Sequence, residues 1–247
     1  MLDTSAWPGL TLLERLAGGA RSDVFHARRG REDLVVRRSG RPTDALDWEL
    51  DLLGFLDGNG IRVPAVVPAG DGQRHVNGVL VQRWLPGGPP RTAADWAAVV
   101  ATVQQVHALT RGWPQRPGFA SSRQLVDQDR GGDVDLSAMP ADAATLVRRA
   151  WEPAMVGAEC AIHGDVGGNN LLVLEGRAAL LDWDEARVDV PWFDFAHLPA
   201  QVTVSTPVHR TDLTTAGVAW EAATCWIAEP QYAAGRLAEL QRRLGAG

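Results

Sequence analysis

The chain has 247 residues, 45% of them hydrophobic, with a net charge of -6 and two cysteines, which is enough apolar content for one large domain or two smaller ones. The two cysteines lie in apolar surroundings and provide neither a disulfide framework nor a zinc site. The negative charge belongs to residues 91–247, which argues against nucleic acid as a partner.

The first residues of the chain and the lengths of its apolar runs indicate where in the cell the protein is expected. The start, "MLDTSAWPGL", has no basic segment followed by an apolar run. No stretch approaches the roughly eighteen uninterrupted apolar residues that a membrane helix needs. We therefore expect a cytoplasmic protein with no membrane partner.

The first part of the chain predicts an antiparallel sheet lobe with one helix. Alternating apolar residues and turn signals predict the strands, and apolar residues at helical spacing predict the helix. The strands are expected at 10–16, 23–29, 33–38, 61–68 and 78–84, and the helix at about 44–57. "LPGGPPR", residues 85–91, is the densest Pro/Gly stretch and predicts a hinge, so residues 1–84 form the N-terminal lobe.

Residues 92–247 predict a mainly helical C-terminal lobe. Thr92 with Asp95 resembles a capping box that opens a helix running to about Leu109. Further helices are expected at about 141–156, 211–228 and 231–244, whereas 112–140 looks irregular. The fold class is therefore α+β with two lobes.

The turn "AGGARS", residues 17–22, joins two strands of the first lobe. Small residues let backbone amides approach phosphate oxygens, which makes Gly18, Gly19, Ala20 and Ser22 candidates for binding nucleotide. A Gly-Gly turn between strands is more often only a hairpin.

Arg37 and Glu49 form a second candidate set. Val35 and Arg37 point to the same face of their strand. Glu49 lies at the edge of an apolar helical seam, where a half-buried carboxylate needs a partner such as Arg37. The alternative is a glutamate that extends into solvent. Since the chain has no lysine, arginine is the only permanent cation available for phosphate.

The stretch "HGDVGGNN", residues 163–170, interrupts two apolar segments that read as short strands. If the chain folds as strand, loop, strand, tight turn and strand, then Asp165, Asn170 and Asp182 converge. Carboxylate and amide oxygens are ligands that magnesium takes, together with water and phosphates. The alternative is a satisfied turn, and for His163 we favour a scaffold role that orients the loop.

"HGDVGGNNLL" followed by "LLDWD" resembles the signature of the aminoglycoside phosphotransferase and choline kinase family. These small-molecule kinases share the bilobal protein-kinase-like fold. The likeness extends over nearly the whole chain, from "LAGGARSDVFHA" and "LVVRR" to "LVQRWLPG" and "DVPWFDFA". One departure is "GGNN", where the family commonly has His-Pro-Gly-Asn.

The resemblance implies a role for each matching residue. Asp165 would accept the proton of an attacking hydroxyl, and Asn170 and Asp182 would hold Mg2+ against the phosphates of ATP or GTP. Asp194 would brace the catalytic loop, and the hinge backbone near 82–84 would receive the base. The nucleotide-binding residues would be Gly18, Gly19, Ala20, Ser22, Val35, Arg37, Glu49, Gln82 and Trp84.

The acceptor is expected to be a small molecule. Asp182 and Asp194 are too close in sequence for the long activation segment of a protein kinase. The acidic second lobe suits an amine-bearing acceptor such as an aminoglycoside, although an ordinary soluble surface has the same charge. Trp220, Glu221 and Trp226 either line an acceptor pocket or pack in the core, and we favour the core.

Two other functions stay open at this stage. One is a kinase-like module that binds nucleotide without transferring phosphate. The other is a hydrolase or metal protein using His107, His163 and His197, whose spacing is not typical of metal ligands. The sequence leaves open the nucleotide, the acceptor and the oligomer.

Overall fold

The computed structural model describes residues 2–16 and 23–245. The four candidates in the glycine turn, Gly18, Gly19, Ala20 and Ser22, lie outside these ranges.

The first lobe is a four-stranded antiparallel sheet in the order β1-β2-β3-β4. Its strands are β1 (Leu10–Arg15), β2 (Val24–Arg29), β3 (Glu32–Arg38) and β4 (Val79–Arg83). A tight turn with Gly30 at φ +62 joins β2 to β3. Val35 pairs with Gln82 across β3 and β4. Leu34 and Val36 face away from them into a small core that also contains Trp7.

One helix, α1 (Thr43–Gly58), belongs to this lobe, as expected. Its apolar residues include Leu46, Leu52 and Leu56, which are buried in the main core of the molecule rather than in the core of the sheet. The helix therefore connects the two lobes. Because it starts soon after β3, its position is tied to the strand that bears Arg37.

The strand expected at 61–68 is not formed. The segment makes only isolated bridges, from Arg62 to Ala179 and from Val66 to Gln82. Pro64 and Pro68 explain this, because proline has no N–H to donate to a strand ladder. The segment still passes close to β4, since Val67 donates its N–H to the carbonyl of Val81 at 2.8 Å.

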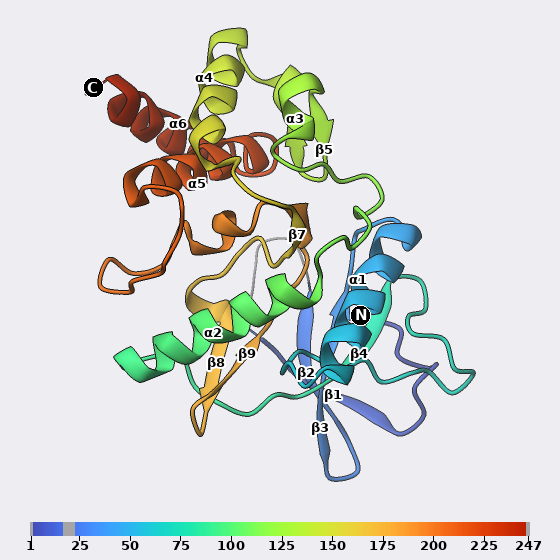
Figure 1. The fold of residues 1–247 in the computed structure, drawn as a ribbon. Helices are drawn as coiled ribbons and strands as arrows, with labels where there is room; N and C mark the ends of the chain where they lie inside the picture. The colour runs from blue at the N-terminus through green and yellow to red at the C-terminus, as the bar shows by residue number, and fades with distance from the viewer. Residues whose placement is uncertain (1, 17–22, 246–247) are drawn as a thin grey trace.

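Helices dominate the second lobe (Figure 1). They are α2 (Ala93–Leu109), α3 (Gln124–Asp127), α4 (Ala141–Trp151), α5 (Arg210–Thr224) and α6 (Pro230–Gly245), with 3₁₀ turns at Leu136–Ala138, Glu152–Ala154, Gly168–Asn170 and Pro191–Phe195. The capping box expected at the start of α2 is present, with Thr92 and Asp95 bonded reciprocally. The α4 helix ends five residues before the predicted 156, next to Pro153.

Short strands flank the loop at residues 163–170 and the segment after it. These are β7 (Cys160–Ile162), β8 (Leu171–Leu174), β9 (Arg177–Leu180) and β10 (Arg187–Asp189), and a further small hairpin is formed by β5 (Arg130–Gly131) and β6 (Val134–Asp135). β7 pairs with β10, and β8 pairs with β9. Glu175 and Gly176, both at positive φ, turn the β8–β9 hairpin. The chain thus follows the expected order of strand, loop, strand, tight turn and strand.

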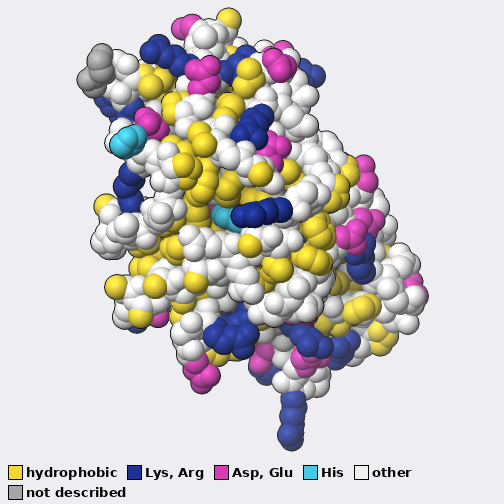
Figure 2. Space-filling view, viewed as in Figure 1, with side chains coloured by type: hydrophobic (Ala, Val, Ile, Leu, Met, Phe, Trp, Pro, Cys, Tyr) yellow, Lys and Arg dark blue, Asp and Glu magenta, His cyan; other side chains and the backbone are white. Residues whose placement is uncertain are grey.

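Figure 1 shows the sheet lobe with α1 at one end of the molecule, α4, α5 and α6 at the other, and β7 between them. Segment 85–91 connects β4 to α2, and we keep 1–84, 85–91 and 92–247 as the proposed division. Within the described ranges, no helix combines the length and the apolar character needed to cross a bilayer. On the face drawn in Figure 2, arginines and acidic side chains are interspersed around a more hydrophobic centre.

Candidate active site

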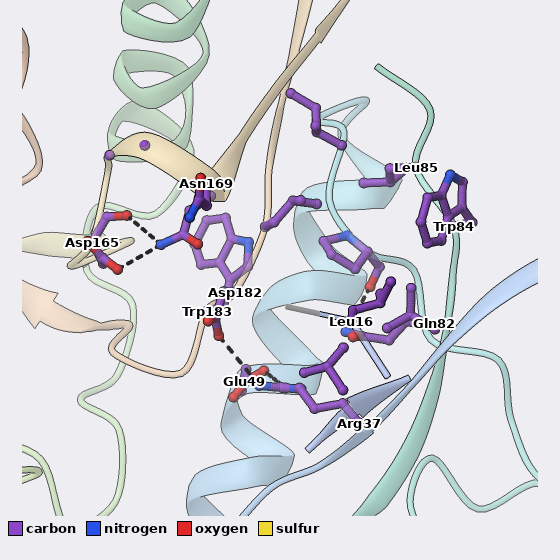
Figure 3. A pocket seen from close by; sticks show the side chains of 18 of the residues that line it. Leu16, Arg37, Glu49, Gln82, Trp84, Leu85, Asp165, Asn169, Asp182 and Trp183 are labelled. Carbon is purple, nitrogen blue, oxygen red and sulfur yellow. Dashed lines mark hydrogen bonds and ion pairs between the residues drawn. The ribbon is translucent and has the colours of Figure 1, made fainter. Parts of the chain in front are cut away.

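A cavity of about 930 Å3 lies where the two lobes meet, and residues of both line it. Figure 3 shows Asp182 between Asp165 on one side and the Arg37–Glu49 pair on the other. The sequence-predicted residues that line this cavity are Val35, Arg37, Glu49, Gln82, Trp84, Asp165, Asn170 and Asp182. The two predicted supporting residues, His163 and Asp194, are both buried.

Asp194 holds the start of the 163–170 loop. Its carboxylate accepts the backbone N–H of His163 at 3.0 Å and of Gly164 at 2.8 Å, and it lies 2.8 Å from Nε2 of His107. Burial acts to raise the pKa of this carboxyl, but the hydrogen bond and charge of His107 outweigh it, and the pKa is lowered. Sequence reasoning missed His107 as a partner of Asp194, because the two are 87 residues apart.

The turn after β7 requires glycine at position 164. Gly164 has φ +87, and a Cβ placed there would lie 2.6 Å from the carbonyl oxygen of Glu185. Its Cα therefore fits closely against the neighbouring segment, which also carries Asp182. The conformation and the close approach both exclude a side chain.

His163 connects the 163–170 loop to the chain after β9. Its Nε2 lies 2.7 Å from the carbonyl of Leu181, and its Nδ1 accepts the backbone N–H of Asp165 at 3.2 Å. This pair of contacts suits a neutral imidazole protonated at Nε2. Its ring packs against Trp183, with centroids 4.7 Å apart.

Asp165 and Asn170 are in direct contact. Nδ2 of Asn170 donates to Oδ2 of Asp165 at 2.7 Å and to its backbone carbonyl at 3.2 Å. The backbone of Asn170 in turn accepts the N–H of Leu181 at 2.8 Å, which brings the residue before Asp182 beside it. Figure 3 shows the side chain of Asn169 next to this pair.

Asp182 follows β9 in a left-handed conformation, with φ +56. This is uncommon for a residue other than glycine and is typical of functional turns. Its Oδ1 lies 4.0 Å from Nη1 of Arg37. Burial raises the pKa of the Asp182 carboxyl, opposed by the positive charge of Arg37 and reinforced by the negative charge of Asp184.

Arg37 and Glu49 form the expected ion pair, and both are buried. Nη2 of Arg37 donates to Oε1 of Glu49. Burial acts to lower the pKa of Arg37, but the carboxylates of Glu49, Asp184 and Asp182 raise it above its usual value. Nε and Nη1 of Arg37 are buried and have no hydrogen-bond partner among the described residues. Arg37 thus has N–H groups available beside the cavity.

Two further arginines at this site were not found from the sequence. Nη2 of Arg116 donates to the second oxygen of Glu49 at 2.9 Å. Arg41 binds the carboxylates of Asp133, at 2.6 and 2.7 Å, and of Asp184, at 2.7 Å. Asp184 is the second aspartate of "LLDWD", and this pairing separates it from Asp182, which lines the cavity.

The oxygen donors at the centre of the cavity fit a magnesium ion. The amide nitrogen of Asn170 is bonded to Asp165, so its amide oxygen is the atom left to bind a cation. Asp182 supplies a carboxylate. Within the described residues there is no group of three or more His, Cys, Asp or Glu suited to a metal. A small number of protein ligands is nevertheless enough for Mg2+, because this ion usually completes its coordination shell with water and substrate phosphates.

One wall of the cavity comes from the end of β4 and the residues that directly follow it. Gln82 is buried, and its amide donates to the carbonyl of Pro64 at 3.3 Å. Trp84 is exposed, and its ring lies 4.8 Å from the ring of His26 between centroids. In Figure 3 this wall lies on the side of the cavity away from Asp165.

His197 and Glu221 also line the cavity. Nε2 of His197 lies 3.9 Å from Oε1 of Glu221, which also accepts the hydroxyl of Tyr232 at 2.9 Å. Arg236 lies 3.4 Å from the other oxygen of Glu221.

The two tryptophans near Glu221 have other contacts. Trp220 packs against Trp151, with ring centroids 5.4 Å apart, and its ring is buried in the core. Trp226 donates its indole N–H to the carbonyl of Ala138 at 3.0 Å. Of the three residues considered for an acceptor pocket, Glu221 is the one that lines the cavity.

Comparison with known proteins gives a family match. The model of the phosphotransferase enzyme family matches residues 13–238. No curated protein matches the chain significantly.

Solved structures of small-molecule kinases resemble the whole chain. A microcompartment-associated aminopropanol kinase is 18% identical with a TM-score of 0.69, covering 98% of this chain and 95% of that one. A choline/ethanolamine kinase family protein from Mesorhizobium loti is 19% identical with a TM-score of 0.58, covering 94% and 87%. A thermostable mutant of an aminoglycoside phosphotransferase is 17% identical with a TM-score of 0.65, covering 96% of both chains.

Proposed function

Because the chain belongs to the phosphotransferase enzyme family, we propose that it transfers the γ-phosphate of ATP or GTP to a hydroxyl of an amine-bearing small molecule, with Asp165 as catalytic base. The family and the α+β bilobal, protein-kinase-like fold predicted from "HGDVGGNNLL" and "LLDWD" are confirmed. The prediction of an enzyme of the small-molecule kinase type is also confirmed at the level of the family.

The observation that carries the proposal is the set of side chains gathered in one cavity. Asp165 and Asp182 come from the second lobe, and Arg37 comes from the first. Phosphoryl transfer needs positioning of donor and acceptor and neutralisation of phosphate charge, with little covalent help from the protein. A base, a cation ligand and an arginine beside one another supply these needs.

Asp165 is the proposed base because of where its carboxylate lies. Its hydrogen bond from Asn170 fixes one oxygen, and the residue lines the cavity that would hold the acceptor. An acceptor hydroxyl within hydrogen-bond reach could pass its proton to this carboxylate as the bond to phosphorus forms. The contact with Asn170 orients Asp165.

Arg37 is the proposed phosphate ligand of the first lobe. Its Nε and Nη1 lack hydrogen-bond partners among the described residues, and a phosphate oxygen would satisfy them. Its charge is held in place by Glu49. Asn170 and Asp182 would hold a Mg2+ ion, which when bound offsets the negative charge of the phosphates.

The wall formed by Gln82 and Trp84 is the proposed site of the nucleotide base. Both residues line the cavity on the side away from Asp165. The proposed co-substrate also supports the cytoplasm as location, since ATP and GTP are available there.

An amine on the acceptor is supported by Glu221. Its carboxylate is the acidic group that lines the cavity from α5, beside His197. A cationic amine held there would place a hydroxyl of the same molecule toward Asp165. The aminopropanol, choline/ethanolamine and aminoglycoside kinases named above are consistent with such an acceptor.

The test is release of nucleoside diphosphate with Mg2+ and either ATP or GTP, across aminoglycosides, choline, amino alcohols, amino sugars and sugars without an amine. We expect an amine-bearing acceptor to stimulate release, and Asp165→Asn to abolish the stimulation. Asp142→Asn, on the exposed first turn of α4, is the matched control and should keep full activity.

Two other results would contradict the proposal. Stimulation only by acceptors without an amine would overturn the proposal of an amine-bearing acceptor but would leave the proposed phosphoryl transfer in place. Binding of magnesium nucleotide with no acceptor-dependent release would favour a nucleotide-binding module without transfer activity.

A further inference from the structure

Arg116 is a fully buried arginine in the irregular stretch between α2 and α3, with 1% of its surface exposed. A guanidinium inside a protein is costly unless its N–H groups are bonded. Those of Arg116 are bonded to the carbonyls of Ala45, Trp183, Asp184 and Ala186 and to the carboxylate of Glu49. This set joins two elements that are distant in sequence.

The first element is α1. Nε of Arg116 donates to the carbonyl of Ala45 at 3.1 Å, and Nη2 donates to Oε2 of Glu49 at 2.9 Å. Since Arg37 binds Oε1, the Glu49 carboxylate is held between two arginines. Arg116 therefore fixes the oxygen of Glu49 that Arg37 does not use.

The second element is the segment that begins at Asp182. Nη1 of Arg116 donates to the carbonyls of Trp183, Asp184 and Ala186 at 3.2, 2.9 and 3.1 Å. These residues follow Asp182 directly, and Asp182 itself has a left-handed backbone conformation. Bonds to the carbonyls that follow it restrict the direction in which the Asp182 side chain enters the cavity.

The surroundings of Arg116 fit its planar guanidinium. Its Cζ lies 4.5 Å from the ring centroid of Phe119 and 5.6 Å from that of Trp48. A flat guanidinium can stack on aromatic rings and donate in several directions within its plane, whereas an ammonium group cannot do both. Lysine would keep the charge but lose most of these contacts.

Arg116 lies outside the cavity lining, so it has no direct route to a phosphate. Its contacts reach the site only through Glu49 and the 183–186 carbonyls. Every donor and acceptor in this network belongs to the protein, so the network needs no group from a nucleotide to form.

We propose that Arg116 is a positioning residue that fastens the Glu49 carboxylate and the segment beginning at Asp182 in the arrangement that receives a magnesium nucleotide, before the nucleotide binds. The inference rests on the proposed function, since it assigns Arg37 and Asp182 to the phosphates and metal. It predicts that loss of Arg116 weakens nucleotide use more than acceptor use.

The test compares Arg116→Lys with Arg148→Lys. Arg148 also donates to backbone carbonyls, of Leu125 and Gln128, and to the carboxylate of Asp129, but none of these lines the cavity. We expect Arg116→Lys to raise KM for the magnesium nucleotide at least about tenfold, because Glu49 and the segment after Asp182 lose the donors that hold them in place. KM for the acceptor should change less than twofold. Arg148→Lys should leave both constants unchanged.

A second readout separates positioning from general destabilisation. If Arg116 acts through Glu49, the two substitutions should not be independent. The fold-loss of nucleotide affinity in the double variant Arg116→Lys, Glu49→Gln should then be clearly smaller than the product of the fold-losses in the two single variants. Multiplying losses, equal changes in both KM values, or a nucleotide KM within twofold of wild type would overturn the inference.

Hydrogen exchange of the wild type tests the same inference if Arg116→Lys does not fold. The amides of 45–52 and 182–187 should be equally protected with and without a non-hydrolysable magnesium nucleotide, because the network is already closed. Protection that appears only when nucleotide is added would overturn the inference. Failure of the proposed function is distinguishable, because wild type would then show no acceptor-dependent release of nucleoside diphosphate.

Discussion

Replacing Arg37 by methionine tests the assignment of the phosphates to this residue. The substitution keeps a long side chain but removes the guanidinium, whose Nε and Nη1 have no hydrogen-bond partner among the described residues. Hydrogen bonds to charged groups contribute about 1.5 to 3 kcal/mol each. Loss of two such bonds to a phosphate therefore corresponds to at least about 3 kcal/mol, or a rise of at least roughly 100-fold in KM for the nucleotide.

The effect on stability should be smaller than for a typical broken buried ion pair. Removing one partner of such a pair costs about 3–5 kcal/mol when the other charge is left alone. Glu49 is not left alone, because Arg116 still donates to it at 2.9 Å. We therefore expect Arg37→Met to lower the free energy of unfolding by only about 1–3 kcal/mol.

The assay measures KM for ATP and for GTP with Mg2+, together with urea unfolding. Arg38→Met is the matched control, since Arg38 is the next residue of β3, points to its other face and is exposed. A nucleotide KM within twofold of wild type for Arg37→Met, or an equal loss for Arg38→Met, would refute the reasoning.

Two further predictions concern the support of the catalytic loop. In urea unfolding, Gly164→Ala should destabilise the fold by about 1–3 kcal/mol more than Gly72→Ala. Both glycines have positive φ, but a Cβ at 164 would meet the Glu185 carbonyl, whereas one at 72 would meet nothing within 4 Å. Equal losses of stability would show that the close approach at 164 does not matter. The pKa of the Asp194 carboxyl lies below its ordinary value of 3.8, so its contribution to stability is present above pH 3.8 and is lost as the pH falls through the lower folded-state pKa. The difference in unfolding free energy between wild type and Asp194→Asn should therefore shrink below pH 3.8, and a constant difference would contradict the role of the carboxylate.

Local patterns explain why much of the site could be predicted from the sequence. Asn170 and Asp182 flank a hairpin whose turn, Glu175-Gly176, can be recognised in the sequence. Pairing of the two strands of the hairpin therefore brings these two residues close together. Arg37 and Glu49 could be paired because one lies on a strand face and the other on the edge of a helical seam of the next element.

The residues that were missed are linked over long distances in sequence. Arg116 contacts Glu49 across 67 residues, and Arg41 contacts Asp184 across 143. No periodicity or turn signal relates such positions, because tertiary packing alone brings them together. The strand expected at 61–68 failed for a different reason, since Pro64 and Pro68 interrupt its apolar residues and cannot donate to a ladder.

The most direct measurement of the central claim is the turnover of Asp165→Asn at saturating magnesium nucleotide and acceptor. Asparagine can still accept the hydrogen bond that Asn170 donates at 2.7 Å, so the fold and nucleotide binding should persist. Without a carboxylate to take the acceptor proton, kcat should fall on the order of 10² to 10⁴-fold with KM for the nucleotide unchanged. A kcat within threefold of wild type would contradict the account of Asp165 as the base.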